Sequence, residues 1–153
     1  MAKLFTLTVP DVLWINLQVT GAPQAFDFAT LEEATFYQFK NGANFDFAGQ
    51  AARFLSGFYR LSPFAAGNES TAFVGCIAFL EMNGHTLNLA EKEAAAWAKN
   101  IWADPTTARA ALEAKVVPHE LHVDNGVPDP NGIVEGIMDR YPKTIAGFAR
   151  VTA

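Results

Sequence analysis

The chain has 153 residues, 50% of them hydrophobic and 18% charged, and this balance is typical of one globular domain and excludes a disordered chain. The formal net charge of -5 and the scattered lysines and arginines argue against nucleic acid as a partner, because phosphate binding needs clustered basic side chains. No apolar run reaches the ~20 residues of a membrane span and the single Cys76 cannot form an intrachain disulfide, so we expect a cytoplasmic protein that contacts no membrane.

The first helix is predicted after a short apolar segment, residues 4–7, which fits a strand. Thr8 is followed by Pro10 and Asp11, a combination that is typical of a helix N-terminus. We expect this helix to end near Val19.

The next segment, residues 26–28, alternates like an edge strand or flap. Thr30 and Glu33 have the spacing of a capping box, which predicts a second helix from Thr30 to the stop signal at Asn41 and Gly42. A third helix is predicted at 46–61, with a stripe of core residues formed by Phe47, Phe54, Phe58 and Leu61.

The fourth helix, residues 68–82, is apolar on nearly every side, which favours a position in the middle of a bundle. Asn68 is the candidate N-cap, and Asn83 with Gly84 is a typical stop. A fifth helix is predicted from Asn88, with Glu91 as its capping partner, to residues 104–105.

A sixth helix is predicted from Pro105, capped by Asp104, to about Ala114. The rest of the chain is divided by four prolines and a turn signal at 124–126, so we expect an extended segment at 116–123 and a short helix at 133–141. The predicted fold is all-α: residues 1–115 form a compact bundle around helix 68–82, and residues 116–153 form a short irregular extension packed on the same domain.

The histidines do not predict a metal site. His119 and His122 lack the i, i+4 spacing that places two ligands on one helical face, and a strand would place them on opposite sides. His85 follows the stop at Gly84 and is expected in an exposed loop. No Ser-His-Asp arrangement can be assembled around these residues.

The candidate site is the loop that precedes helix 68–82, because the first backbone N–H groups of a helix can hold an anion. The residues expected to bind an anion or other ligand are Ser62, Gly67, Asn68, Glu69, Ser70 and Thr71.

This loop and the helix after it carry a recognisable pattern, in Pro63, Phe64, Gly67, Asn68, Thr71-Ala72 and residues 79–84. The segment resembles the signature of the Fic/Doc family, the fold of death-on-curing toxins and Fic adenylyltransferases. That signature reads His-Pro-Phe, any residue, Asp or Glu, Gly-Asn, Gly or Lys, Arg. The resemblance covers roughly residues 5–103 and implies a helical Fic/Doc-like fold.

The catalytic positions of the signature differ here. Ser62 replaces the family's general base, Ala66 replaces the acidic residue that holds a metal ion, and Ser70 replaces the phosphate-binding Arg. Glu69 stands at the Gly or Lys position, where its charge would repel a phosphate. The segment Asn131 to Gly136 is similar to the inhibitory helix of some Fic proteins, but the Arg that such a helix contacts is missing.

We therefore expect a Fic/Doc-fold protein that uses no cofactor and acts by binding or regulation. By the resemblance, its partner would be a protein such as an antitoxin or a translation factor. The alternative is a divergent nucleotidyltransferase or phosphotransferase that uses ATP and magnesium to modify a protein hydroxyl.

Overall fold

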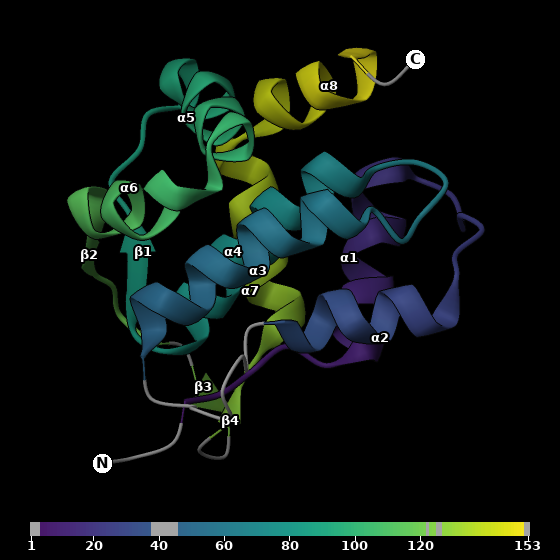
Figure 1. The fold of residues 1–153 in the computed structure, drawn as a ribbon. Helices are drawn as coiled ribbons and strands as arrows, with labels where there is room; N and C mark the ends of the chain where they lie inside the picture. Colours follow the sequence, from purple (N-terminus) through teal and green to yellow (C-terminus); the bar gives the residue numbers. More distant parts are fainter. Residues whose placement is uncertain (1–3, 38–45, 122, 125–126, 152–153) are drawn as a thin grey trace.

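The computed structural model describes residues 4–37, 46–121, 123–124 and 127–151, and these are mostly helical (Figure 1). The α-helices are α1 (Val9–Thr20), α2 (Phe28–Phe36), α3 (Phe47–Leu61), α4 (Asn68–Met82), α5 (Glu91–Ala103), α6 (Ala108–Lys115), α7 (Pro130–Arg140) and α8 (Pro142–Val151). Two short antiparallel sheets pair β1 (His85–Leu87) with β2 (Val116–Pro118) and β3 (Val123–Asp124) with β4 (Val127–Pro128). The prediction of an all-α class is confirmed, and among the described helices none is both long and apolar enough to cross a membrane.

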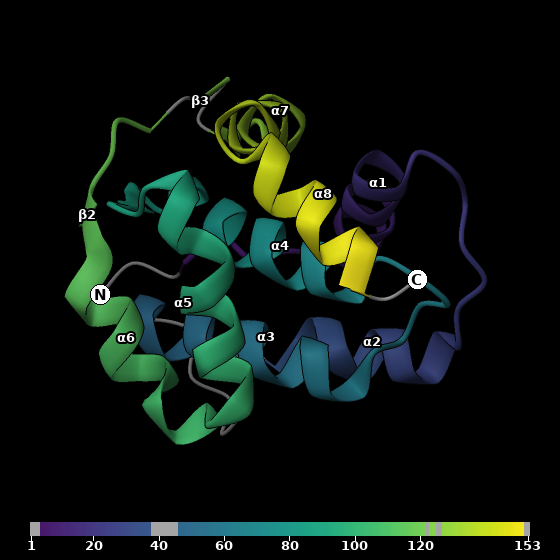
Figure 2. The ribbon, with the colours of Figure 1, turned by 90° about the horizontal axis from the view of Figure 1, so that it is seen from above.

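Helix α4 lies among several other helices. Figure 2 shows it between α3 on one side and α7 with α8 on the other, and it also packs against α1. Every residue of α4 except Glu69 is buried. The α3 face toward α4 carries Phe54 and Phe58, both fully buried, whereas Phe47 and Leu61 at the ends of the predicted stripe are only half-buried.

The N-terminus of α1 follows the sequence pattern. The side chain of Thr8 accepts a hydrogen bond from the N–H of Asp11, and the carboxylate of Asp11 accepts one from the N–H of Thr8, which is a complete capping box. The strand predicted at 4–7 is wrong, because this segment has no regular structure. Its backbone is instead held by Asn83, whose amide accepts from the N–H of Phe5 at 2.8 Å and donates to its carbonyl at 2.9 Å.

Two other predicted helix starts are wrong by a few residues. Helix α2 begins before Thr30, because the carboxylate of Asp27 accepts a hydrogen bond from the N–H of Thr30 at 2.9 Å and is the N-cap. Helix α5 begins after Asn88, because the N–H of Asn88 donates to the carbonyl of Lys115 at 2.8 Å and holds it beside the β1–β2 pair. The predicted stop at residues 41–42 lies outside the described residues.

The start predicted at Pro105 is a 3-10 turn, Pro105–Thr107, and α6 follows it. Asp104 caps this turn as expected, through the N–H of Thr106.

The prediction of an exposed loop at His85 is also wrong. It lies in β1, its ring stacks on Phe47 with centroids 3.9 Å apart, and its partial burial lowers the pKa of the imidazole.

The prediction of an irregular C-terminal extension is wrong, although the short helix expected within it at 133–141 is confirmed as part of α7. Pro130 and Pro142 are the first residues of α7 and α8, positions where proline is compatible with a helix because its missing N–H has no helical partner. Both helices pack on the bundle: the hydroxyl of Tyr141 donates to the carbonyl of Leu89 at 2.7 Å, and the N–H of Lys143 donates to the carboxylate of Glu91 at 2.8 Å. Helix α7 lies against α4, and α8 against α5 and α4.

Candidate functional site

The loop between α3 and α4 has a fixed backbone shape. Ser62 ends α3 in the left-handed region with φ 43°, and its exposed hydroxyl donates to the carbonyl of Tyr59. Gly67 precedes α4 with φ 81°, where a Cβ atom would lie 2.4 Å from the methyl group of Thr20. Both the conformation and the crowding therefore require glycine at position 67.

Asn68 is buried and fixes the loop internally. Its side-chain oxygen accepts from the N–H of Phe64 at 3.0 Å, and its side-chain nitrogen donates to the Phe64 carbonyl at 2.7 Å. Asn68 is the first residue of α4, and Gly67 is the N-cap, so the capping role expected of Asn68 is wrong. The amide instead satisfies two buried backbone groups.

A second asparagine, Asn16, supports the loop from α1. Its side-chain nitrogen donates to the carbonyl of Ala66 at 3.0 Å and to the hydroxyl of Thr71 at 3.1 Å. Asn16 was not among the predicted site residues, although a polar residue next to Ile15 on the apolar face of α1 indicates a buried hydrogen-bonding role. Thr71 is fully buried, and Ser70 is buried with its hydroxyl 3.4 Å from the carbonyl of Ile145 in α8.

Glu69 differs from its neighbours because it is only partly buried. Its carboxylate accepts a hydrogen bond from its own backbone N–H, in the first turn of α4. Burial raises the pKa of this carboxyl, while the hydrogen bond and the positive charge of Lys99 act in the opposite direction. The carboxylate thus lies at the helix end where an external anion would bind.

An extended segment lies against the other side of the loop. Phe26 and Phe64 form an antiparallel bridge, in which the N–H of Asp27 donates to the Pro63 carbonyl at 3.2 Å and the N–H of Ala65 donates to the Ala25 carbonyl at 2.8 Å. The edge strand predicted at 26–28 is therefore limited to this bridge, because Phe28 already belongs to α2.

The outer edge of this segment is open. In such a bridge the N–H and carbonyl of Phe26 face away from Phe64, and within the described part of the chain they have no hydrogen-bond partner. Beside them lies a mostly apolar pocket of about 190 Å³. It is lined by Leu13, Asn16, Leu17, Pro23, Gln24, Phe26 and Phe64.

The six predicted site residues thus share one stretch but not one surface. Ser62 is exposed and Gly67 and Glu69 are half-buried, whereas Asn68, Ser70 and Thr71 are buried. The buried side chains bind main-chain or side-chain groups of the protein itself. At this end of α4 the backbone edge of Phe26 and the pocket beside it are also accessible.

The histidine segment forms no metal site within the described part of the chain. His122 lies outside the described residues, and within them no three His, Cys, Asp or Glu side chains are grouped to hold an ion.

Cys76 is buried in α4, which raises the pKa of its thiol and leaves it unreactive. Glu135, in the segment similar to an inhibitory helix, is exposed on α7.

Comparison of the chain with protein-family models, with curated proteins and with solved structures finds no match in any of the three. The resemblance to the Fic/Doc family therefore rests on the residues of the loop and of α4.

Proposed function

We propose that this chain is a binding protein on a Fic/Doc-like scaffold, which holds an extended segment of a partner protein and does not transfer nucleotides. The observation that carries the proposal is the open backbone edge of Phe26 with an apolar pocket next to it. The partner class, a protein, is also the one that the family resemblance implies.

The loop residues support the first part of this proposal. Ser62 has no proton affinity near neutral pH and Ala66 has no ligand atom, so neither a general base nor a metal ligand is available at these positions. The Glu69 carboxylate lies at the amide end of α4. At a separation of ~5 Å and an effective dielectric of about 20, each unit of phosphate charge would be repelled by roughly 3 kcal/mol.

The Phe26 edge supports the second part. An unpaired N–H and carbonyl on an extended segment are a template for another strand, and partners that add a strand gain affinity from main-chain bonds and specificity from pockets for alternate side chains. Phe26 lines the pocket and is 44% exposed, so the pocket opens to solvent beside it. The Phe26 ring packs edge-on against the buried ring of Phe64, with centroids 5.8 Å apart. Its volume of about 190 Å³ suits a single apolar side chain.

A phage-displayed library of random peptides, screened on the full chain, tests this function. We expect selected peptides to carry a large apolar residue, and the variant Phe26→Pro to weaken their binding at least about tenfold, or about 1.4 kcal/mol. This change removes the free N–H but leaves both bridge hydrogen bonds, which use Asp27 and Ala25.

Phe28→Pro is the matched control. Phe28 is 59% exposed, is the first residue of α2 and does not line the pocket, so proline is tolerated there and binding should change by less than about twofold. Selected peptides that bind the Phe26→Pro variant as well as the native chain, or a screen that enriches none, would contradict the proposal.

A further inference from the structure

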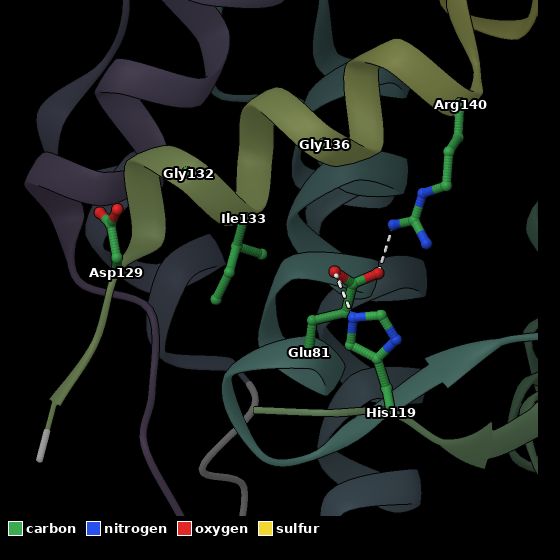
Figure 3. A pocket seen from close by; sticks show the side chains of 7 residues that line it. All are labelled: Glu81, His119, Asp129, Gly132, Ile133, Gly136 and Arg140. Carbon is green, nitrogen blue, oxygen red and sulfur yellow. Dashed lines mark hydrogen bonds and ion pairs between the residues drawn. The ribbon is translucent and has the colours of Figure 1, made fainter. Parts of the chain in front are cut away.

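We propose that a groove along α7 binds a short peptide with free amino and carboxyl ends. This groove lies between α7 and the C-terminal end of α4, as Figure 3 shows, and it has a volume of about 480 Å³. Pockets for small molecules have volumes of about 300–1,000 Å³. The site is distinct from the Phe26 edge, since the two share no lining residue.

One end of the groove is a polar cluster built on a buried carboxylate. Glu81 has a side chain that is only 5% exposed, and its Oε2 accepts hydrogen bonds from Arg140 and, at 2.7 Å, from the hydroxyl of Thr86. Its Oε1 lies 3.5 Å from Nε2 of His119. A buried carboxylate that contacts two basic side chains from different elements fixes both of them in place.

Part of the Arg140 guanidinium is available to bind a ligand. Only its Nη2 atom contacts Glu81, and within the described residues its Nε and Nη1 make no hydrogen bond. Its side chain is 40% exposed, and Figure 3 shows it reaching from the end of α7 toward Glu81. A guanidinium can bind a carboxylate through two parallel N–H groups while it keeps a third contact.

The other end of the groove is acidic. Asp129 precedes α7, is exposed, and accepts no capping hydrogen bond from the helix. Its carboxylate lies against Gly132, where a Cβ atom would be 2.8 Å from Oδ2. Figure 3 places Asp129 and Arg140 at opposite ends of α7.

The wall between these ends has little side-chain volume. Gly132 and Gly136 line it with Ile133, and a Cβ atom at Gly136 would have no atom within 4 Å. The groove is therefore open along the helix and apolar in the middle.

The charges select the ligand. The two carboxylates of Glu81 and Asp129 and the single guanidinium of Arg140 leave one net negative charge, which disfavours a simple anion. A simple cation would lie near Arg140 and be repelled by it. A molecule with an ammonium at Asp129 and a carboxylate at Arg140 is matched at both ends.

The length of the ligand follows from the length of α7. Residues 129 and 140 are separated by about 16 Å along the axis at ~1.5 Å per residue, and the Arg140 side chain shortens the gap between the charges. An extended chain spans ~3.3–3.6 Å per residue, so about three residues fill the remaining distance. The ligand class is therefore a tripeptide or a peptide of similar length.

Isothermal titration of the full chain with tri-alanine tests this inference. We expect saturable binding, at least about tenfold stronger than for N-acetyl-tri-alanine amide, which lacks both end charges, and stronger than for L-alanine, which is too short. Equal affinity for the blocked peptide or for L-alanine, or no saturable binding of tri-alanine at millimolar concentration, would overturn it.

Gly136→Leu adds a side chain to the wall of the groove, at a position where a Cβ atom has no neighbour within 4 Å, and we expect it to weaken tri-alanine binding at least about tenfold. Gly147→Leu on α8, where a Cβ atom also has nothing within 4 Å, is the matched control and should leave binding within about twofold. Asp129→Asn removes the negative charge that is proposed to bind the ammonium group, and it should therefore weaken tri-alanine binding at that end of the groove only. Unchanged binding in both Gly136→Leu and Asp129→Asn would refute the site.

Discussion

The two ends of α4 use their polar side chains differently. At the N-terminal end, Asn68 and Thr71 are buried and bonded to the protein's own loop. At the C-terminal end, Glu81 holds Arg140 and His119 at the edge of a cavity, and part of that polar surface remains available. The polar side chains of the family-like motif are thus the more closed ones, and the cavity at the other end is built by elements that are distant in sequence.

The largest effect expected from a point change is at the C-terminal end. Arg140→Gln leaves the buried Glu81 carboxylate without its guanidinium, and breaking a buried ion pair typically costs about 3–5 kcal/mol. Because Arg140 is 40% exposed, water can partly replace it, and we expect a loss of about 2–3 kcal/mol in urea unfolding. Glu113→Gln, which breaks an exposed i, i+4 pair with Arg109, is the control and should cost about 0.3–0.5 kcal/mol.

Asn68 and Asn83 allow the same hydrogen-bond pattern to be compared at the two ends of α4. Each amide bonds the N–H and the carbonyl of one phenylalanine, Phe64 or Phe5, but the pair at Phe64 is buried and the pair at Phe5 is exposed. Asn68→Ala should cost about 2 kcal/mol, because two buried backbone groups lose their partners, and Asn83→Ala about 1 kcal/mol. If the two variants lose the same free energy of unfolding, burial does not decide how much these hydrogen bonds contribute to stability.

The hydroxyl groups at the two ends give a smaller contrast. Thr86 donates to the Glu81 carboxylate at 2.7 Å, whereas Ser70 lies 3.4 Å from the carbonyl of Ile145. We expect Thr86→Val to lower the free energy of unfolding by about 1.5 kcal/mol, since its acceptor is charged, and Ser70→Ala by about 0.5 kcal/mol. A larger loss for Ser70→Ala would mean that the α4 to α8 contact is stronger than its geometry indicates.

The smallest effect is the pH dependence of Glu69. Because burial raises the pKa of this carboxyl, the folded state binds more protons than the unfolded state between the two pKa values, so its contribution to stability falls as pH rises through that window. Glu69→Gln should remove this fall of the unfolding free energy with pH above the ordinary carboxyl pKa of about 4.3. At neutral pH we expect the substitution to change the free energy of unfolding by less than about 0.5 kcal/mol. Glu93→Gln, in the exposed first turn of α5, should leave the slope of the melting temperature against pH unchanged.

The sequence predicts the features that depend on neighbouring residues. The capping box of Thr8 and Asp11 and the burial of an all-round apolar segment in α4 can be inferred from local patterns. The tail was misjudged because a proline can either break a helix or begin one, and packing against α4 and α5 decides between these outcomes.

The candidate site depends still more on distant contacts. Asn16 lies 55 residues from Thr71, and Glu81 lies 59 residues from Arg140, and no local pattern connects these partners. Asn88 was expected to cap a helix but is held by a backbone bond to Lys115, which a capping signal cannot anticipate. The resemblance of residues 62–71 to a family motif indicated a region of the molecule, but the environment of each side chain depends on the fold.

The most direct test of the proposed function is an NMR titration of the labelled chain with magnesium and ATP, with the backbone amides of Gly67 to Thr71 as the readout. If this end of α4 is closed to nucleotide phosphates by Glu69 and lacks the catalytic groups, these amides should show no saturable shift at millimolar nucleotide. Saturable shifts at Gly67 and Asn68, together with transfer of label from ATP to a protein, would contradict the account and favour a nucleotidyltransferase or phosphotransferase.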